Sequence, residues 1–291
     1  MPNKLYLECY SGISGDMTVA ALLDLGADQQ VLLEGLESLN LPGYQLKIGR
    51  VKKNGIDACD FDVILDEPEH HHDHDHEHDH DHDHDHEHDH DHDHEHHHHH
   101  EHEHDHEHHH DHEHHHHHDH VHRNIGDIFA IIDQSKISDR AKQTAKDIFR
   151  IIAAAESKAH GIAEDQVHFH EVGAVDSIVD IVSAAICLDN LDITEAVVSD
   201  LYEGCGYVHC QHGLMPVPVP AVVNIAADNA LRLRLTQTRG EMITPTGAAI
   251  AAYLSKGGKL PESFVIEKIG LGAGKKDFAT ANILRAFLIR D

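Results

Sequence analysis

Residues 70–122 hold 33 of the chain's 38 histidines and 19 of its 52 acidic residues, and the one other residue among them is Val121. A segment of this composition cannot bury enough apolar surface to offset the conformational entropy lost on ordering. We therefore predict a disordered insertion at 70–122. It divides one folded domain into an N-terminal segment at 1–69 and a remainder at 123–291.

The charge outside this histidine-rich block limits the classes of partner. There, 33 acidic residues face 22 lysines and arginines, so the folded part is only moderately acidic although the whole chain carries a net charge of −30. No basic stripe is present that could neutralise phosphates, which argues against nucleic acid binding. The apolar stretch at 178–188 contains Asp180 and is shorter than the ~20 residues that a bilayer span requires. We expect no membrane association.

The amino terminus lacks the long apolar core of a secretion signal, which favours a cytoplasmic protein. Five cysteines are scattered along the chain. An odd, dispersed set does not form a disulfide framework, so free thiols are expected.

Hydrophobic periodicity predicts interleaved helices and strands. A strand at 4–9, a turn at 11–16 and a helix at 17–25 open the chain. Asn54-Gly55 between alternating stretches at 44–53 and 58–65 predicts a β-hairpin. Further helices are predicted at 31–39, 125–132, 139–160, 175–188, 221–227 and 244–253, and strands at 197–201, 207–210, 264–269 and 283–289. The fold class is therefore α/β or mixed α+β, with helices packed on a sheet.

The histidine-rich block predicts metal binding. Neutral imidazole is a ligand for nickel, cobalt, copper and zinc, and dense histidines offer many alternative ligand sets. The adjacent histidines expected to bind metal include three pairs: His71 with His72, His98 with His99, and His116 with His117. A pH-responsive or solubilising tract is the alternative. A flexible block imposes no geometry and would favour copper, so selectivity for another metal must come from elsewhere.

A second candidate metal site spans residues 168–180. His168 and His170 alternate around Phe169, so both imidazoles face one side of an extended segment. Asp176 and Asp180 are four residues apart and share a face of the following helix. Two imidazoles and one or two carboxylates could hold a divalent ion at this junction. The alternative is a structural pair between one histidine and Asp176.

Two turns at predicted helix starts are candidate anion sites. The sequence S-G-I-S-G-D at 11–16 matches neither a Walker loop nor a dinucleotide-binding fingerprint. In this turn, Asp16 either contacts a metal or caps the helix. In the second turn, at 241–247, Thr244 and Thr246 supply hydroxyl groups for a phosphate or carboxylate. Ordinary capping by Thr244 is the alternative.

Two glycine-containing segments give weaker signals. Cys205, His209, Cys210 and His212 are potential ligands, but their spacing matches no standard zinc pattern. A histidine that lines a site is the favoured interpretation of this segment. The stretch at 270–276 is interpreted as a flexible glycine turn with two basic residues.

Four separated motifs occur in a defined order: S-G-I-S-G-D-M at 11–17, H-F-H-E-V-G at 168–173 with Asp176-Ser177, H-G at 212–213 before P-V-P, and T-P-T-G-A at 244–248. This combination closely resembles the nickel-insertion (LarC) family, over almost the whole chain outside the histidine-rich block. The resemblance implies nickel insertion into a nicotinate-derived pyridinium bisthiocarboxylate mononucleotide. The product would be the nickel-pincer cofactor of lactate racemase-type enzymes.

The resemblance also implies a chemistry and a set of site residues. The reaction would be a CTP-dependent cyclometallation assisted by Mg²⁺ or Mn²⁺, a lyase-type nickel chelatase activity, and nickel would become bound through two sulfurs and a ring carbon. His168, His170, Glu171 and Asp176 fall on one family motif. His168, His170 and Asp176 are expected to contact metal, and His170, Glu171 and Asp176 to act in catalysis. Cofactor binding is expected at Asp16, His212, Thr244 and Thr246.

Members of the family generally continue into a further domain. This chain therefore resembles one half of a split protein and is expected to work with a C-terminal counterpart, as a homo-oligomer, upstream of an apo lactate racemase-type enzyme. The alternative function is a non-catalytic nickel store or metallochaperone that acts with a separate catalytic partner. A small-molecule hydrolase with an incidental histidine tract is a third, weaker hypothesis.

Overall fold

The computed structural model describes residues 3–66, 123–167, 175–210 and 212–290. The histidine-rich block, with the six histidines chosen as ligands, lies outside these residues. So do His168, His170 and Glu171. What the sequence predicts for those positions stays a prediction.

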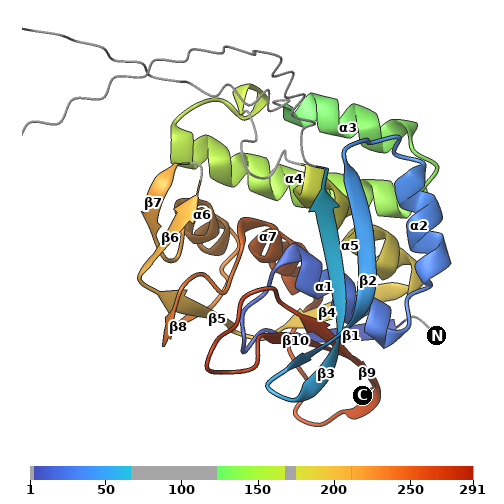
Figure 1. Cartoon of the computed structure of the whole chain (residues 1–291), viewed down its shortest axis with the longest axis vertical. Coiled ribbons are helices and arrows are strands. Elements are labelled where there is room, and N and C mark those ends of the chain that lie inside the picture. Colours follow the sequence, from blue (N-terminus) through green and yellow to red (C-terminus); the bar gives the residue numbers. More distant parts are fainter. Residues whose placement is uncertain (1–2, 67–122, 168–174, 211, 291) are drawn as a thin grey trace, which may run out of the picture. The chain divides into compact units, whose positions relative to one another are not determined.

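A six-stranded mixed sheet runs in the order β2-β3-β9-β10-β1-β4 (Figure 1). Its strands are β1 (Asn3–Glu8), β2 (Tyr44–Lys53), β3 (Ile56–Leu65), β4 (Ile193–Val198), β9 (Val265–Ala273) and β10 (Ile283–Arg290). β1 pairs antiparallel with β10 and parallel with β4, so strands encoded before and after the histidine-rich block share one sheet. Two small sheets pair β5 (Leu201–Cys205) with β8 (Leu233–Arg239) and β6 (Tyr207–Cys210) with β7 (Gly213–Pro216).

Helices pack on this sheet, which confirms the predicted α/β class. They are α1 (Gly15–Leu25), α2 (Gln29–Glu37), α3 (Ile125–Gln134), α4 (Asp139–His160), α5 (Val175–Asn190), α6 (Pro220–Asp228) and α7 (Pro245–Leu254), with short 3₁₀ turns at Glu164–Gln166 and Ser255–Gly257. α1 contacts β3, β9 and β10, and α5 packs between α1 and α4. None of the described helices is long and apolar enough to cross a membrane.

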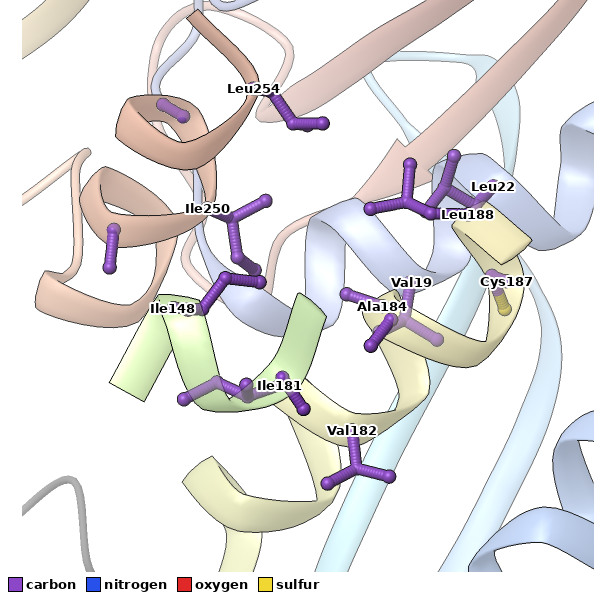
Figure 2. Close-up of a cluster of buried hydrophobic side chains, with 14 of the residues drawn as sticks. Val19, Leu22, Ile148, Ile181, Val182, Ala184, Cys187, Leu188, Ile250 and Leu254 are labelled. Carbon is purple, nitrogen blue, oxygen red and sulfur yellow. The ribbon is translucent and has the colours of Figure 1, made fainter. Parts of the chain in front are cut away.

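The main core lies where α1, α4, α5 and α7 meet. Figure 2 shows Val19 and Leu22 of α1 with Ile181 and Leu188 of α5 and Ile250 of α7. Every residue from 181 to 188 is buried, which confirms the prediction of a buried helix. This all-round burial fixes the start of α5, and the side chains that it carries, relative to α1 and α7.

The predicted hairpin is confirmed, and its turn has the expected chemistry. Lys53 pairs with Ile56 across a two-residue turn. Asn54 has φ of 49° and Gly55 has φ of 84°. Positive φ at both positions is the signature of a type I′ turn, which Asn-Gly favours because glycine and asparagine tolerate the left-handed region.

The prediction of a single strand at 197–201 is wrong, because the chain passes from one sheet to another within this range. β4 ends at Val198 beside β1, and β5 begins at Leu201 beside β8. Ser199 lies between the two strands, where its amide donates to Leu7 O at 2.9 Å and its hydroxyl accepts from the Cys9 amide at 2.8 Å. The β5–β8 pairing was not predicted, although L-R-L-R-L-T-Q-T-R at 231–239 alternates with the period of a strand.

The prediction of a flexible glycine turn at 270–276 is also wrong for the first half of that stretch, since β9 continues to Ala273. A Cβ on Gly270 would lie 2.1 Å from Ala21 O, and one on Gly272 would lie 2.0 Å from Met17 O. The glycines therefore let the backbone of α1 press directly against the sheet, which is a packing role rather than a source of flexibility.

Candidate functional site

Three helices begin at one pocket of about 410 Å³. The first turns of α1, α5 and α7 contribute to its wall, so three partially positive helix ends point toward the same space. Its lining includes Asp16, Asp176, Asp180, Thr244, Thr246 and Lys275. The structure thus brings together five candidate residues from motifs that are separate in the sequence: Asp16, Asp176, Asp180, Thr244 and Thr246. A larger cavity of about 740 Å³ beside α2 and α5 contains none of the predicted site residues.

The two candidate turns form a single unit. The Ile13 amide donates to Met242 O at 3.0 Å, and the Thr244 amide donates to Ile13 O at 3.1 Å. A Cβ on Gly12, whose φ is 88°, would lie 2.1 Å from Met242 O, and one on Gly247 would lie 2.2 Å from Ile13 O. Both glycines are needed for this close approach. The turn that carries Asp16 is therefore fixed against the turn that carries Thr244.

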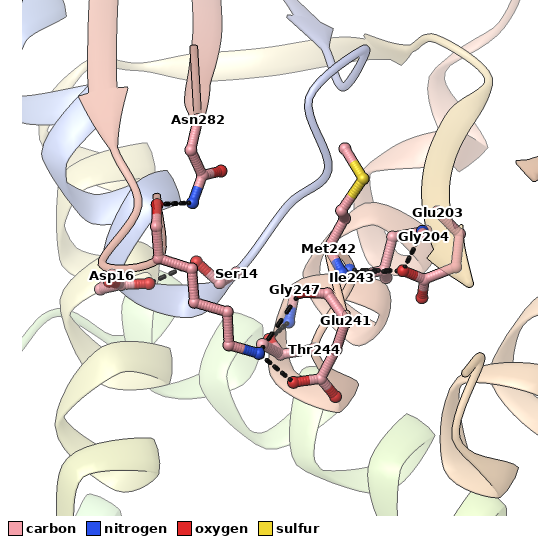
Figure 3. A network of polar contacts seen from close by, with 11 residues as sticks. Ser14, Asp16, Glu203, Gly204, Glu241, Met242, Ile243, Thr244, Gly247 and Asn282 are labelled. Atoms are coloured by element: carbon pink, nitrogen blue, oxygen red, sulfur yellow. Dashed lines mark hydrogen bonds and ion pairs between the residues drawn. The ribbon is translucent and has the colours of Figure 1, made fainter. Parts of the chain in front are cut away.

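Local hydrogen bonds set the side chains of these turns. The Ser14 hydroxyl donates to the carboxylate of Asp16 in the first turn of α1 (Figure 3). Thr244 Oγ1 accepts from the Gly247 amide at 3.1 Å, which confirms Thr244 as the cap of α7. The capping bond occupies an acceptor lone pair and leaves the hydroxyl hydrogen free to donate toward the pocket.

Three of the carboxyl groups that line the pocket, those of Asp16, Asp176 and Asp180, have a raised pKa. Burial is the largest cause for all three. The pKa of Asp180 is raised well above its ordinary value, and the charges of Asp16 and Asp176 add to the effect of burial. For Asp16, the hydrogen bond from Ser14 and the charge of Lys275 partly oppose the rise in pKa. A divalent cation would reverse these shifts by stabilising the charged carboxylates.

Two of these carboxyl groups have an oxygen with no hydrogen-bond partner in the described part of the chain. Asp176 Oδ1 and Asp180 Oδ1 are both buried. A buried, unpaired carboxylate oxygen is costly, and coordination of a metal ion is a common way to satisfy it. Among the described residues, however, no three His, Cys, Asp or Glu side chains already form a ligand group. A metal bound here would need the carboxylates to turn, or ligands from outside the described residues.

Lys275 was not predicted from the sequence as a site residue, although it lines the pocket. Its Nζ lies 2.8 Å from Asp60 Oδ1 and 3.3 Å from Asp62 Oδ1. Burial alone would lower its pKa, but the hydrogen bond to Asp60 and the charges of Asp60, Asp62 and Asp16 together raise it. Lys275 is therefore a charged group held at the pocket. Its only sequence signal is a basic residue directly after a glycine-rich strand.

His212 lies elsewhere. It is exposed in the connection between β6 and β7, and its ring centroid is 4.8 Å from that of His160 at the end of α4. His212 does not line the pocket, whereas His209 and Cys210 of β6 do. The role predicted for His212 stays a prediction, and the histidine of this segment that faces the pocket is His209.

The chain is similar to known proteins along its whole length. The family described as nickel insertion protein matches residues 5–291. A pyridinium-3,5-bisthiocarboxylic acid mononucleotide nickel insertion protein of Alkaliphilus metalliredigens is 59% identical over 292 residues, covering 100% of this chain and 61% of that protein. Proteins of the same name from Clostridium acetobutylicum and Acetivibrio thermocellus are 45% and 38% identical, with 98% of this chain and 63% and 60% of theirs covered. The chain thus spans about 60% of the length of these relatives. No solved structure matches the chain.

Proposed function

Because the chain belongs to the nickel insertion protein family, we propose that it binds Ni²⁺ and takes part in its insertion into pyridinium-3,5-bisthiocarboxylic acid mononucleotide. The observation that carries the proposal is a pair of buried oxygens, Asp176 Oδ1 and Asp180 Oδ1, that have no hydrogen-bond partner among the described residues and lie at a pocket where three helices begin. Nickel is here a substrate, delivered to an organic ligand.

Asp176 and Asp180 contact the metal in this proposal, and Asp16 adjusts the charge of the pocket from the first turn of α1. Carboxylates alone favour Mg²⁺, Ca²⁺ or Mn²⁺ over Ni²⁺. Imidazoles shift this preference toward nickel, and we propose that His168 and His170, which directly precede α5 in the sequence, supply them. The histidine-rich block raises the local nickel concentration near this site.

Insertion with formation of a nickel–carbon bond releases one proton for each ring C–H bond that is broken. The C–H electron pair becomes the bond to nickel, the proton passes to a base, and no oxidant is consumed. A base held within hydrogen-bond reach of the ring carbon accepts this proton by general base catalysis. We propose Asp176 for this step, together with His170 and Glu171, so that a group beside the bound metal receives the proton.

The substrate carries a phosphate, and the same pocket offers donors for it. Thr244 and Thr246 lie at the start of α7, where backbone amides and the helix dipole favour an anion. Lys275 adds an ammonium group to the pocket, which also pairs with Asp60 and Asp62. We propose that these groups orient the mononucleotide with its ring toward Asp176.

CTP with Mg²⁺ or Mn²⁺ belongs to the proposal through the family resemblance. The oxygens of Asp176 and Asp180 that lack a partner within the described ranges fit a hard divalent cation, for which oxygen ligands are preferred. When bound, the nucleotide and its cation would supply the free energy of phosphate hydrolysis. We assign no described residue to the cytosine base.

The second candidate function is a nickel store or metallochaperone that passes the ion to a separate catalytic chain. The 33 histidines of the block favour it. In either case we propose a cytoplasmic homo-oligomer that works with a C-terminal counterpart and serves an apo lactate racemase-type enzyme.

Mass spectrometry of the nickel-containing product tests the proposal. The full chain is incubated with Ni²⁺, the mononucleotide, CTP and Mg²⁺, with and without the remaining part of the Alkaliphilus metalliredigens protein. We expect product with the unsubstituted chain and with Asp139→Asn, an exposed control at the start of α4. We expect none with Asp176→Asn, although its histidine-rich block is intact. Equal product from Asp176→Asn would refute the assignment of this pocket.

A further inference from the structure

Glu203 is a fully buried carboxyl group on β5 that does not line the pocket. Its Oε1 accepts three backbone hydrogen bonds, from the amides of Gly204 at 2.7 Å, Met242 at 2.8 Å and Ile243 at 3.3 Å (Figure 3). Its Oε2 is buried and has no partner in the described part of the chain. A single side-chain oxygen thus holds β5 to the segment just before Thr244.

The contact is reinforced by backbone packing. The Gly240 amide donates to Cys205 O at 3.0 Å. A Cβ on Gly204 would lie 1.8 Å from Gly240 O, so only glycine allows the two backbones to approach this closely. The segment from 240 to 243 is therefore held at both ends against β5, by main-chain contact at Gly240 and by Glu203 at Met242 and Ile243.

Backbone hydrogen bonds connect this segment to both turns that line the pocket. Met242 O accepts from the Ile13 amide, and Ile13 O accepts from the Thr244 amide. Ile13 is followed by Ser14, whose hydroxyl donates to Asp16. Glu203 is thus connected to the turn that bears Asp16 through its own bond from the Met242 amide and one backbone hydrogen bond between Met242 and Ile13. Its bond from the Ile243 amide connects it to the residue directly before Thr244.

A buried carboxyl group at a purely structural position would be a costly choice, because an apolar side chain of the same volume is usually tolerated better. Glu203 instead supplies the acceptor for two amides of a segment that belongs to none of the strands in the described part of the chain. Without it, the amides of Met242 and Ile243 would have to find another acceptor or stay unpaired, and the segment would shift.

We propose that Glu203 is a positioning residue that holds segment 240–244, and through it the turn at 12–16, in the conformation that binds a divalent cation. The role depends on the acceptor oxygen and not on the negative charge. This inference rests on the function proposed above, since the cation site is the one assigned to Asp176 and Asp180.

Two readouts on the full chain test it. Hydrogen exchange reports the protection of the amides at 12–16 and 240–244. Mn²⁺ binding, followed by electron paramagnetic resonance, reports oxygen ligands. Because the 19 acidic residues of the histidine-rich block also offer oxygen ligands, the binding that Asp180→Asn removes is the part assigned to the carboxylate pocket. Glu203→Met keeps the volume and removes the acceptor, whereas Glu203→Gln keeps the acceptor and removes the charge. Ser135→Ala, which removes a buried hydroxyl bonded to Ile132 O, controls for general loss of stability, and Asp180→Asn marks the pocket.

We expect Glu203→Met to speed exchange in both segments, including residues 12–16 that Glu203 does not touch, and to weaken Mn²⁺ binding about tenfold, the effect of losing roughly one hydrogen bond. Glu203→Gln should stay within about twofold of the unsubstituted chain, as should Ser135→Ala. Unchanged exchange and binding in Glu203→Met, or equal losses in Glu203→Gln, would overturn the proposal.

The result with Asp180→Asn separates this inference from the proposed function. If Asp180→Asn leaves Mn²⁺ binding unchanged, the metal pocket is wrongly assigned, and exchange alone decides the role of Glu203. Faster exchange at 12–16 in Glu203→Met then supports the positioning role, and unchanged exchange overturns it. If Glu203→Met does not fold, Glu203→Gln decides: retained protection and binding support the acceptor role, and a tenfold loss overturns it.

Discussion

Asp180 lies against the backbone of Gly15, so closely that a Cβ on Gly15 would be 2.4 Å from Asp180 Oδ2. The first turn of α1 and the second turn of α5 therefore meet at a point that only glycine permits. This contact places a buried carboxyl group of one helix at the partially positive end of another. It also explains why Asp16 and Asp180 share a pocket although 164 residues of sequence separate them.

Gly15→Ala should disrupt this contact. The added methyl group must displace Asp180, so we expect at least tenfold weaker divalent-cation binding and a loss of about 1–3 kcal/mol in the free energy of unfolding. Gly49→Ala is the matched control, since a Cβ on Gly49 meets nothing within 4 Å. Urea unfolding and Mn²⁺ titration measure both variants. Equal behaviour of the two would show that the contact at Gly15 is not required.

Asp180→Asn should bind metal poorly and yet be more stable at neutral pH. The pKa of Asp180 is raised by burial and by the charges of Asp16 and Asp176, so the ionised form is strained without a bound cation. The neutral isostere removes that cost, and we expect a gain of about 1–2 kcal/mol in the free energy of unfolding at pH 8. Thermal melts without metal provide the measurement. A clear loss of stability would mean that the Asp180 carboxylate stabilises the folded state even without a metal.

Glu203 should make stability depend on pH. Burial is the main cause that raises its pKa from 4.5 to about 7, so the folded state holds the proton more tightly than the unfolded state. Stability from this group is present below pH 4.5 and falls as pH rises toward 7, by about 3 kcal/mol. When the pH is lowered from 8 to 5, the unfolding free energy of the unsubstituted chain should therefore increase relative to that of Glu203→Gln. The same difference at both pH values would contradict the raised pKa.

The fold could be predicted where local signals agree with tertiary structure. Asn54-Gly55 determines its own turn, and the apolar run at 181–188 fits only a buried helix. The prediction failed where long-range packing decides. Gly270 and Gly272 look like a turn in sequence, but they are strand residues that face α1. The break at Ser199 depends on partners from two different sheets, which no short window of sequence contains.

The candidate site was predicted only in pieces. Asp16, Asp176, Thr244 and Thr246 were each singled out, because helix starts carry recognisable residues. That they line one pocket follows from the hydrogen bonds of Ile13 and from the packing of α5 on α1. Glu203 gave no sequence signal, since a lone acidic residue in a short strand is ordinarily exposed. Its burial is set by the segment at 240–243, which approaches from a distant part of the chain.

Nickel capture by the histidine-rich block should weaken below neutral pH. Imidazoles must be deprotonated to bind a metal, and unperturbed histidine has a pKa of about 6.5. We expect the number of Ni²⁺ ions bound by the full chain to fall several-fold between pH 7.5 and pH 5.5, as counted by equilibrium dialysis. A chain in which a Gly/Ser linker replaces residues 70–122 should show a much smaller change. Equal pH dependence in the two chains would mean that the block is not the main ligand.

We propose a selective metal site in the folded part of the chain, apart from the histidine-rich block. Calorimetric titration with Ni²⁺ of the linker chain, alone and with Asp180→Asn or His170→Ala, measures this site without the block. We expect one tight site in the linker chain that either substitution removes. Loss of all tight binding with the block, or a tight site that survives Asp180→Asn, would contradict it.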